Sequence, residues 1–380
     1  MSEINFAGQK LGILGGGQLG LMFIQAAMNY GVELFILDPD AAASCSSYCK
    51  NFTQGSFLDE ETVYNFGKDL DIVTIEIENV NIAALKRLEA EGVSVFPQPA
   101  VIELIQDKGL QKQFFLDHGI PTAPFLLIDK KDELQGFIHL FPAVMKSRKA
   151  GYDGRGVFML NKATDIAAAF TVPSILENRV EFVKELSVLV ARNERGEIET
   201  FDVVEMEFNA DANLVEYLIA PARISLLVEA DARSLAVRII TELKMVGLLA
   251  VEMFLTADGA LVVNELAPRP HNSGHHTIEA NYVSQYEQHL RAVLNMHLGS
   301  TRARSNAVMV NLLGEQEFDG PARYDGIDLI ADMEGVYIHL YGKKTTRPNR
   351  KMGHITVIGD DLTEAYLKAQ FIRDNLKVRA

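Results

Sequence analysis

Short apolar segments alternate with helical patterns through the first hundred residues of the chain. In chain order, the strand-like and helical segments cover residues 10–14, 21–29, 33–37, 60–68, 72–77, 82–91 and 93–96. Strands that alternate with helices in this way predict βαβ units and a small parallel sheet. The pair Pro97 and Pro99 then marks the end of a first α/β domain at about residue 98.

The pattern changes in the middle and at the end of the chain. A helix is predicted from Asp107 to Gly119, where the glycine and the following Pro121 supply a stop signal. A second helix is predicted over residues 231–245. The remaining strand-like segments cover residues 143–146, 157–160, 175–180, 186–191, 308–313, 336–341 and 355–358. We therefore predict a mixed central region followed by a block of short β segments.

Two acids flank a predicted β-hairpin in the central region. Glu252 and Glu265 lie at the ends of two apolar runs on either side of the turn signal Thr-Ala-Asp-Gly at 256–259. A hairpin would bring the two carboxylates together, where they repel each other unless a cation lies between them. Mg²⁺ that bridges nucleotide phosphates is the commonest cation in such a place. The alternative is a pair of solvated acids on the rim of a sheet.

A glycine-rich loop directly follows the first predicted strand. Gly15-Gly-Gly-Gln-Leu-Gly20 leads into a helical pattern, and Asp38 ends the next strand. The motif matches the dinucleotide fingerprint Gly-x-Gly-x-x-Gly with an acid about twenty residues further on, so NAD is one interpretation. The loop by itself predicts only an anion site, because the free amides at a helix N-terminus can bind many different anions.

A second glycine-rich segment lies between two predicted strands. Residues 151–156 read Gly-Tyr-Asp-Gly-Arg-Gly and follow a strand that ends in Lys146. Such a loop can fold its amides over a phosphate chain while Lys146 and Arg155 supply positive charge, although a plain hairpin tip is the alternative. The strand at 175–180 can offer backbone groups to a base, and Glu185 can accept a hydrogen bond from a ribose hydroxyl.

The segment after the hairpin is rich in histidine. His271, His275 and His276 suggest a zinc site, but the nearby prolines and Gly274 oppose the helix that such a site needs. The glutamate of a His-Glu-x-x-His motif is also missing. We interpret the segment instead as a wall that faces the substrate, formed by Arg269, His271, Asn272 and Ser273.

A basic cluster stands out near the end of this acidic chain. Arg347, Arg350 and Lys351 lie in Arg-Pro-Asn-Arg-Lys-Met-Gly-His at 347–354. Their functional interpretation is a second anion site, for a phosphate that does not belong to a nucleotide. The alternative is a solvated turn.

Composition narrows the class of protein. A chain of 380 residues exceeds the size at which one hydrophobic core keeps growing, so two or three domains are expected. The formal net charge of -15 opposes a general role in binding nucleic acid or anionic membranes. We expect a cytoplasmic protein, because no apolar run reaches the roughly eighteen residues of a membrane helix and no leader pattern opens the chain. Cys45 and Cys49 are interpreted as reduced structural thiols.

The order of these motifs resembles that of the ATP-grasp enzymes, in which two subdomains clamp ATP and Mg²⁺. The resemblance is carried by Lys146, the loop at 151–156, Glu185, Glu252 and the pair Asn264-Glu265. Three longer motifs narrow it: the first glycine loop, Asn-Glu-Leu-Ala-Pro-Arg-Pro-His-Asn-Ser-Gly-His at 264–275, and the basic motif at 347–354. Together they resemble the family of 5-(carboxyamino)imidazole ribonucleotide synthetases, which are ligases of purine biosynthesis, over essentially the whole chain.

The resemblance implies a domain plan and a set of ligands. It implies an α/β chain with an ATP-grasp fold, in which a Rossmann-like parallel-sheet domain covers residues 1–98. The ATP-grasp domain would cover 99–298, with a small lid subdomain at about 120–180, and a small β-rich domain would cover 299–380. ATP and Mg²⁺ are the implied cofactors, aminoimidazole ribonucleotide and bicarbonate are the implied substrates, and a homodimer is the implied assembly.

The resemblance also implies roles for individual residues. The implied ATP contacts are Lys108, Lys146, Gly151, Tyr152, Asp153, Gly154, Arg155, Gly156, Val157, Glu177, Asn178, Arg179, Val180, Glu185, Asn264 and Glu265. The implied metal ligands are Glu252 and Glu265. The implied ribonucleotide contacts are Gly16, Gly17, Gln18, Leu19, Glu76, Asn272, Ser273, Lys343, Arg350 and Lys351. The residues implied to act in the reaction are Tyr152, Asp153, Arg155, Arg269, His271 and Lys351. Glu76 and Glu78 share one face of their predicted strand.

The implied reaction joins bicarbonate to an amine of the substrate. Bicarbonate attacks the γ-phosphate to give carboxyphosphate, while Mg²⁺, Lys146, Arg155 and Arg269 stabilise the charge on the transferred group. CO₂ released in the closed site is then captured by the amine. Because water would hydrolyse carboxyphosphate, we predict that the loop at 151–156 becomes ordered when ATP binds. Asn349 and Phe208 depart from the family, which often has glycine and histidine at these positions.

Three other functions compete with this one. A formate-dependent glycinamide ribonucleotide transformylase would share the fold, but Gln18 and Met352 differ from its usual motifs. A nicotinamide dehydrogenase would explain residues 12–38 and nothing later. A non-catalytic nucleotide sensor would keep the cleft and lose the metal acids, yet both Glu252 and Glu265 are present.

Overall fold

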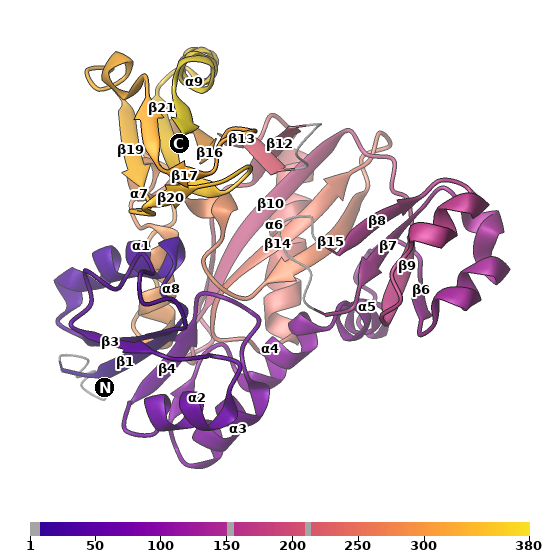
Figure 1. The fold of residues 1–380 in the computed structure, drawn as a ribbon, viewed down its shortest axis with the longest axis horizontal. Helices are drawn as coiled ribbons and strands as arrows, with labels where there is room; N and C mark the ends of the chain where they lie inside the picture. Colours follow the sequence, from indigo (N-terminus) through magenta and orange to yellow (C-terminus); the bar gives the residue numbers. More distant parts are fainter. Residues whose placement is uncertain (1–7, 150–155, 210–213) are drawn as a thin grey trace.

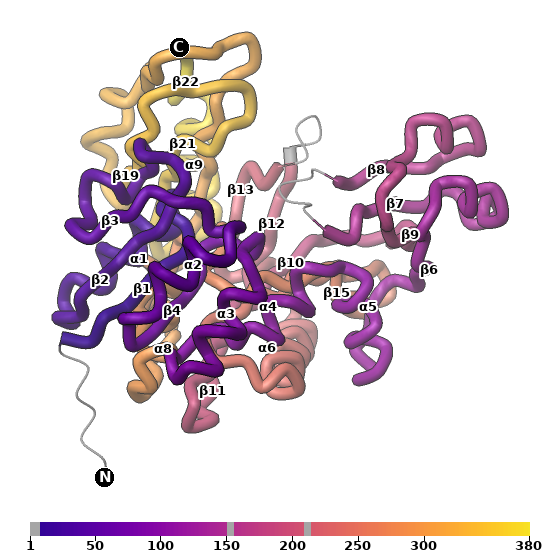
Figure 2. Tube along the Cα trace, turned by 60° about the horizontal axis from the view of Figure 1, so that its bottom comes forward, coloured from indigo at the N-terminus to yellow at the C-terminus, as the bar shows by residue number. Residues whose placement is uncertain are grey.

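Three large sheets organise the chain. A computed structural model describes residues 8–149, 156–209 and 214–380. In this part of the chain, a five-stranded sheet, a four-stranded sheet and a nine-stranded sheet follow one another (Figure 1). In both views, the four-stranded sheet lies at the far end of the molecule from strands β19 and β21 (Figure 1, Figure 2).

The first sheet is the parallel one that the sequence predicts. Its strand order is β3-β2-β1-β4-β5, and each pair is parallel. The strands are β1 (Lys10–Leu14), β2 (Glu33–Asp38), β3 (Asn51–Gln54), β4 (Ile72–Ile75) and β5 (Ser94–Val95). The helices between them are α1 (Gln18–Ala27), α2 (Glu60–Gly67) and α3 (Ile82–Ala90). Side-chain oxygens of Asp59 and Asn81 cap α2 and α3 by accepting from backbone N–H groups.

Two consecutive helices lead from the first sheet to the small sheet. They are α4 (Pro99–Gln106) and α5 (Lys108–Asp117). Asp107 separates them, because its carboxylate accepts from the N–H groups of Gly109 and Leu110 and so starts a new helix. The small sheet is antiparallel, with the order β6-β9-β7-β8. Its strands are β6 (Phe125–Ile128), β7 (Ala143–Ser147), β8 (Val157–Leu160) and β9 (Ser174–Asn178).

The third sheet runs through the rest of the molecule. Its order is β15-β14-β10-β12-β13-β16-β21-β19, and β11 pairs with β10 at the side. The strands are β10 (Lys184–Arg192), β11 (Ile198–Thr200), β12 (Val204–Asn209), β13 (Leu214–Ala220), β14 (Gly247–Leu255), β15 (Leu261–Ala267), β16 (Asn306–Leu313), β19 (Val336–Leu340) and β21 (Lys351–Gly359). Because β13 pairs with β16, this sheet extends across the boundary predicted at residue 298.

Helices cover the large sheet and complete its cores. Helix α6 (Leu226–Glu242) packs Ala232, Ala236 and Ile239 against the apolar face of β10 and β14. Helix α9 (Leu362–Asn375) covers β16 and β21. Helix α8 (Gln285–Val293) lies between the first and third sheets, and its Tyr286 and Leu290 share a core with α1.

Short elements complete the described chain. They are α7 (Thr277–Ala280), β17 (Gly320–Pro321), β18 (Arg323–Asp325), β20 (Thr345–Thr346), β22 (Lys377–Arg379) and the 3-10 turns η1 (Met28–Tyr30), η2 (Lys131–Leu140), η3 (Ala163–Ala168), η4 (Asn272–Gly274) and η5 (Ile327–Leu329). Among the helices of the described residues, none is both long and apolar enough to cross a membrane.

Candidate active site

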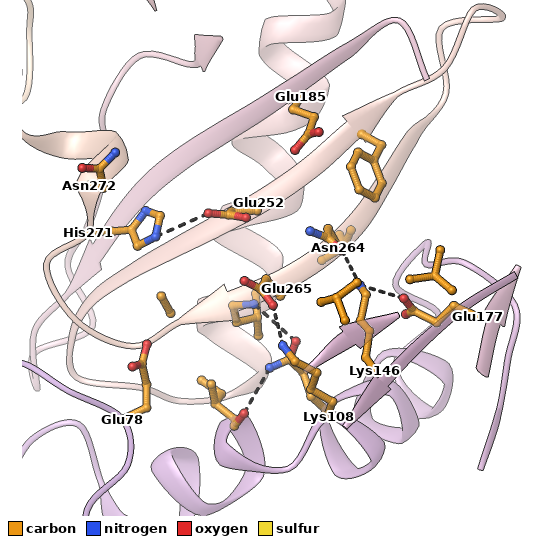
Figure 3. A pocket seen from close by; sticks show the side chains of 18 of the residues that line it. Glu78, Lys108, Lys146, Glu177, Glu185, Glu252, Asn264, Glu265, His271 and Asn272 are labelled. Carbon is orange, nitrogen blue, oxygen red and sulfur yellow. Dashed lines mark hydrogen bonds and ion pairs between the residues drawn. The ribbon is translucent and has the colours of Figure 1, made fainter. Parts of the chain in front are cut away.

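The two acids singled out by the sequence are direct cross-strand neighbours. Glu252 on β14 pairs with Glu265 on β15, so both side chains project from the same face of the hairpin (Figure 3). The sequence suggested that each acid ends its strand. In the structure neither does, because β14 continues to Leu255 and β15 to Ala267. Glu185 on β10 adds a third carboxylate beside them.

The two acids have opposite electrostatic surroundings. Burial and the nearby carboxylates of Glu265 and Glu185 raise the pKa of Glu252 to about 8. The Lys108 ammonium lowers the pKa of Glu265 to about 2, despite its burial. Burial raises the pKa of Glu185 to about 7. On the hairpin, the charge of Glu265 is therefore compensated, whereas Glu252, like Glu185 on the adjacent strand β10, lacks sufficient positive charge nearby.

Lysines from two different elements face these acids. Lys108, the first residue of α5, forms an ion pair with Glu265. Lys146 on β7 lies 2.7 Å from Oε2 of Glu177 and donates a 2.8 Å hydrogen bond to Oδ1 of Asn264 (Figure 3). The small sheet and the large sheet thus meet through polar contacts at one place.

A single cavity of about 990 Å³ contains this cluster and extends to the N-terminus of α1. The described residues with predicted roles that line it are Gln18, Leu19, Glu76, Lys108, Lys146, Val157, Glu177, Asn178, Arg179, Val180, Glu185, Glu252, Asn264, Glu265, Arg269, His271, Asn272 and Lys351. Gly151, Tyr152, Asp153, Gly154 and Arg155 fall in 150–155, outside the described residues. The described residues with predicted roles that lie off its wall are Gly16, Gly17, Gly156, Ser273, Lys343 and Arg350.

The first glycine loop differs from its predicted use. The N–H of Gly16 donates to Oδ2 of Asp38 at 2.7 Å, and those of Gly17 and Gly20 donate to the carboxylate of Glu76. Protein acids therefore occupy amides that were expected to hold an anion. Gly16 and Gly17 are unsuited to a substrate phosphate in this arrangement.

Glu76 and Glu78 also differ from the prediction that they share a strand face. Strand β4 ends at Ile75, so both acids lie in the bend that follows it. Glu76 turns toward the N-terminus of α1, whereas Oε1 of Glu78 lies 2.8 Å from the Arg269 guanidinium. Glu76 remains on the cavity wall, but its contacts are with the glycine loop.

Among the described residues, the histidine-rich segment does not bring together the ligands that a zinc site needs. No group of three or more His, Cys, Asp or Glu side chains within the described ranges is placed to hold a metal ion. The Ser273 N–H donates to Nδ1 of His271, which leaves the ring proton on Nε2, 3.4 Å from Oε1 of Glu252. His275 instead forms a hydrogen bond with Tyr286, and its ring centroid lies 4.6 Å from that of His354 with the rings tilted by 30°.

Three residues predicted to contact the ribonucleotide have other partners. The Ser273 hydroxyl lies 2.8 Å from that of Ser187 and is fully buried, so it faces the protein interior. Lys343 donates to the carbonyl of Lys351, and Arg350 donates to the carbonyl and hydroxyl of Thr345. Of the basic cluster, Lys351 is the member that lines the cavity.

Sequence reasoning missed one buried cation of the site. Lys112 on α5 lines the cavity, and its Nζ lies 2.5 Å from Oε1 of Glu177. Its spacing was a usable signal, because residues four apart on a helix share a face and Lys108 is four positions earlier. Phe182 and Phe254 were also missed; their rings stack 4.6 Å apart on the cavity wall.

Comparison with known proteins gives three family matches along the chain. Residues 8–106 match the ribonucleotide synthetase preATP-grasp domain, and residues 113–286 match the ATP-grasp domain. Residues 307–368 match the phosphoribosylaminoimidazole carboxylase C-terminal domain.

Individual proteins resemble the chain over nearly its full length. N5-carboxyaminoimidazole ribonucleotide synthase of Brucella melitensis is 38% identical over 92% of this chain and 96% of its own. The crystal structure of N5-carboxyaminoimidazole ribonucleotide synthetase from Thermotoga maritima has a TM-score of 0.91 and 41% identity, with 98% of this chain and 99% of that chain covered. A synthase from Aspergillus clavatus, solved with ADP and 5-aminoimidazole ribonucleotide, has a TM-score of 0.88 and 32% identity, with 97% and 99% covered.

Proposed function

The chain belongs to the N5-carboxyaminoimidazole ribonucleotide synthetase family of ATP-grasp ligases, and we propose that its cavity uses Mg²⁺-ATP and bicarbonate to carboxylate 5-aminoimidazole ribonucleotide. Membership places the chain in purine biosynthesis as an ATP-dependent ligase. The observation that carries the proposal is the single cavity. Lys108, Lys112 and Lys146, here called its lysine end, line it with the paired acids, and Lys351 and the start of α1 line it too. A nucleotide and a ribonucleotide can therefore be held side by side.

ATP would lie against the lysine end of this cavity. Lys108 and Lys146 would contact its phosphates, because each ammonium group reaches the cavity from a separate element. The strand end Glu177–Val180 would border the base, together with the stacked rings of Phe182 and Phe254. Tyr152, Asp153 and Arg155 keep their proposed roles at the phosphates and the substrate, although they lie outside the described residues.

The hairpin acids fit a magnesium ion. Mg²⁺ typically takes one or two protein carboxylates and completes its shell with phosphate oxygens and water. Glu252 and Glu265 supply such a pair. Burial and then repulsion from Glu265 and Glu185 raise the pKa of Glu252, and a divalent cation would relieve the repulsion. When bound, the ion would neutralise charge on the triphosphate. The adjacent His271 would orient the Glu252 carboxylate through its Nε2 proton.

The part of the cavity lined by Asn272, Arg269 and Lys351 would hold bicarbonate and the ribonucleotide. The Asn272 side chain is suited to a ligand, because both of its buried amide atoms lack a hydrogen-bond partner among the described residues. Arg269, held by Glu78, would attract bicarbonate and stabilise the carboxyphosphate that forms from it. Lys351 would bind the ribonucleotide phosphate with the remaining helix amides of Gln18 and Leu19.

Coupled ADP formation tests the proposal. We expect wild-type protein with ATP and Mg²⁺ to release ADP only when both bicarbonate and 5-aminoimidazole ribonucleotide are present. Glycinamide ribonucleotide with formate serves as the competing substrate pair. ADP release with that pair, or release independent of any ribonucleotide, would contradict the proposal.

Assembly and location complete the proposal. We propose a homodimer in the cytoplasm, which rests on family membership. Sedimentation velocity at micromolar concentration would test the dimer, and a monomer under those conditions would remove it.

A further inference from the structure

One buried carboxylate is shared by two lysines from different parts of the fold. Glu177 on β9 is 4% exposed. Its Oε1 lies 2.5 Å from Nζ of Lys112 on α5, and its Oε2 lies 2.7 Å from Nζ of Lys146 on β7. Lys112 is itself buried, with 3% of its side chain exposed, and it also contacts the hydroxyl of Thr122.

The two lysines contribute unequally to the cavity. Burial opposes ionisation of Glu177, yet the ammonium groups of Lys146 and Lys112 hold its pKa below the usual value. Lys146 also reaches Asn264 beside the hairpin acids (Figure 3). Lys112 lies deeper, against Glu177 and Thr122. Glu177 can neutralise only one of the two lysines, so the cluster has a net charge of one positive unit. Lys146, which is nearer the hairpin acids, is the lysine that can bind an anionic ligand.

A conflict arises if Lys146 must serve both Glu177 and a triphosphate. If Lys146 were the only cation beside Glu177, its movement to the phosphates would leave a buried carboxylate unpaired, which is strongly destabilising. Glu177 would then retain Lys146 and keep it from the phosphates. We infer that Lys112 is a positioning residue that keeps Glu177 paired and thereby releases Lys146 to bind ATP. This inference rests on the proposed function, since it assumes that ATP binds at the lysine end of the cavity.

The ion pair between Lys112 and Glu177 joins helix α5 to the small sheet. Lys112 and Lys108 lie four residues apart on α5, and Glu177 and Lys146 lie on neighbouring strands of the small sheet. Arg148 reinforces the junction, because it forms a two-point ion pair with Asp107, the capping residue of α5. The helix that carries Lys108 and the sheet that carries Lys146 are thus held together around the ATP position.

A double-mutant cycle separates this role from a general structural one. The variants are Lys112→Met, Glu177→Gln and the double variant, with the dissociation constant for ATP and Mg²⁺ measured by calorimetry. We expect Lys112→Met to raise that constant about tenfold, because Glu177 then retains Lys146. The double variant should return to within about threefold of Glu177→Gln, because no carboxylate remains to retain Lys146.

Lys184→Met is the matched control. Lys184 also shares a buried carboxylate, Glu205, with a second cation, Arg223, but this cluster lies off the cavity wall. Its loss should change the ATP dissociation constant by less than about twofold. The KM for 5-aminoimidazole ribonucleotide should stay within about twofold in Lys112→Met, since Lys112 contacts Glu177 and Thr122, which are not among the proposed ribonucleotide contacts.

Two results would overturn the inference. One is a double variant that binds ATP no better than Lys112→Met, and the other is normal ATP affinity in Lys112→Met itself. Should Lys112→Met fail to fold, the comparison of Glu177→Gln with the double variant decides: a difference above about threefold rejects the inference. If wild type and Lys184→Met bind ATP and form ADP, the proposed function stands whatever Lys112 does. If wild type binds no ATP, both fall.

Discussion

The lysine side and the acid side of the cavity balance charge in opposite ways. On the lysine side, formed by α5, β7 and β9, each lysine has an acid partner: Lys108 pairs with Glu265, while Lys112 and Lys146 share Glu177. On the acid side, formed by β10 and β14, Glu185 and Glu252 lie close together with raised pKa values. On the lysine side, the charges are therefore compensated by ion pairs within the protein. On the acid side, the negative charge is compensated only when a cation binds.

The strongest test of this contrast compares Glu265→Gln with Glu252→Gln. Both variants should lose roughly 100- to 1,000-fold in kcat, because each removes an anionic ligand of the proposed metal site. Their stabilities should change in opposite directions. Glu265→Gln leaves the Lys108 ammonium without its partner and should lower Tm, whereas Glu252→Gln removes a repelled acid and should raise it. Calorimetric unfolding without ligands measures this, and equal shifts in Tm would refute the contrast.

A smaller effect is expected for Lys351, the proposed ligand of the ribonucleotide phosphate. Lys351→Met should raise the KM for 5-aminoimidazole ribonucleotide roughly 10- to 100-fold and leave the KM for ATP nearly unchanged. Arg350→Ala is the control, because its guanidinium bonds Thr345 and lies off the cavity wall. We expect less than about a threefold change there. Steady-state kinetics with each substrate varied in turn would measure both constants. A raised KM for ATP with an unchanged KM for 5-aminoimidazole ribonucleotide would contradict the prediction.

The smallest expected effect is the dependence of stability on pH. The pKa of Glu252 is raised from 4.5 to about 8 in the folded protein, so its stabilising contribution is complete below pH 4.5 and is lost as the pH rises toward 8. Burial of Glu185 acts in the same direction up to about pH 7. Glu265 has a lowered pKa, so its contribution is lost only as the pH falls below 4.5 toward 2.

Unfolding midpoints across this pH range provide the measurement. Without ligands, the wild-type midpoint should fall more steeply between pH 4.5 and 8 than that of Glu252→Gln. Mg²⁺ and ATP should flatten the wild-type curve, because bound cation favours the ionised carboxylate. Parallel curves for the two proteins would show that Glu252 titrates normally.

Local patterns predicted the elements that are locally determined. The apolar runs at β1, β2 and β4 gave the parallel sheet, and the turn signal at 256–259 gave the hairpin that pairs Glu252 with Glu265. Element ends were less accurate. The helix expected from residue 231 begins at Leu226, where Ser225 caps it.

Elements stabilised by distant polar contacts were missed. Strands β12 and β13 contain Glu205 and Glu216, which interrupt the apolar pattern but pair with Arg223 and Arg373 from later in the chain. Helix α8 was missed for the same reason: its buried Gln288 and His289 bond groups at Gly299 and Thr74. A sequence pattern treats such residues as exposed, because their partners become neighbours only after folding.

The site residues follow the same rule. The place of Lys146 before the second glycine loop was visible in the sequence, and the family resemblance implied Lys108. The occupation of the Gly16 and Gly17 amides by Asp38 and Glu76 was not visible. That arrangement depends on how β2 and β4 flank β1. The loop motif therefore indicated an anion site. The tertiary structure determines which backbone N–H groups of the loop are free to bind the anion.

The pairing of β13 with β16 makes residues 306–380 inseparable from the rest of the protein. Truncation before β16 would leave the backbone N–H and C=O groups of Tyr217–Ala220 on an open edge. Tyr217 and Ile219 would lose the apolar cover that α9 helps to provide. An open edge with exposed apolar side chains invites strand pairing between molecules, so a shortened protein should aggregate rather than survive as a smaller nucleotide-binding unit.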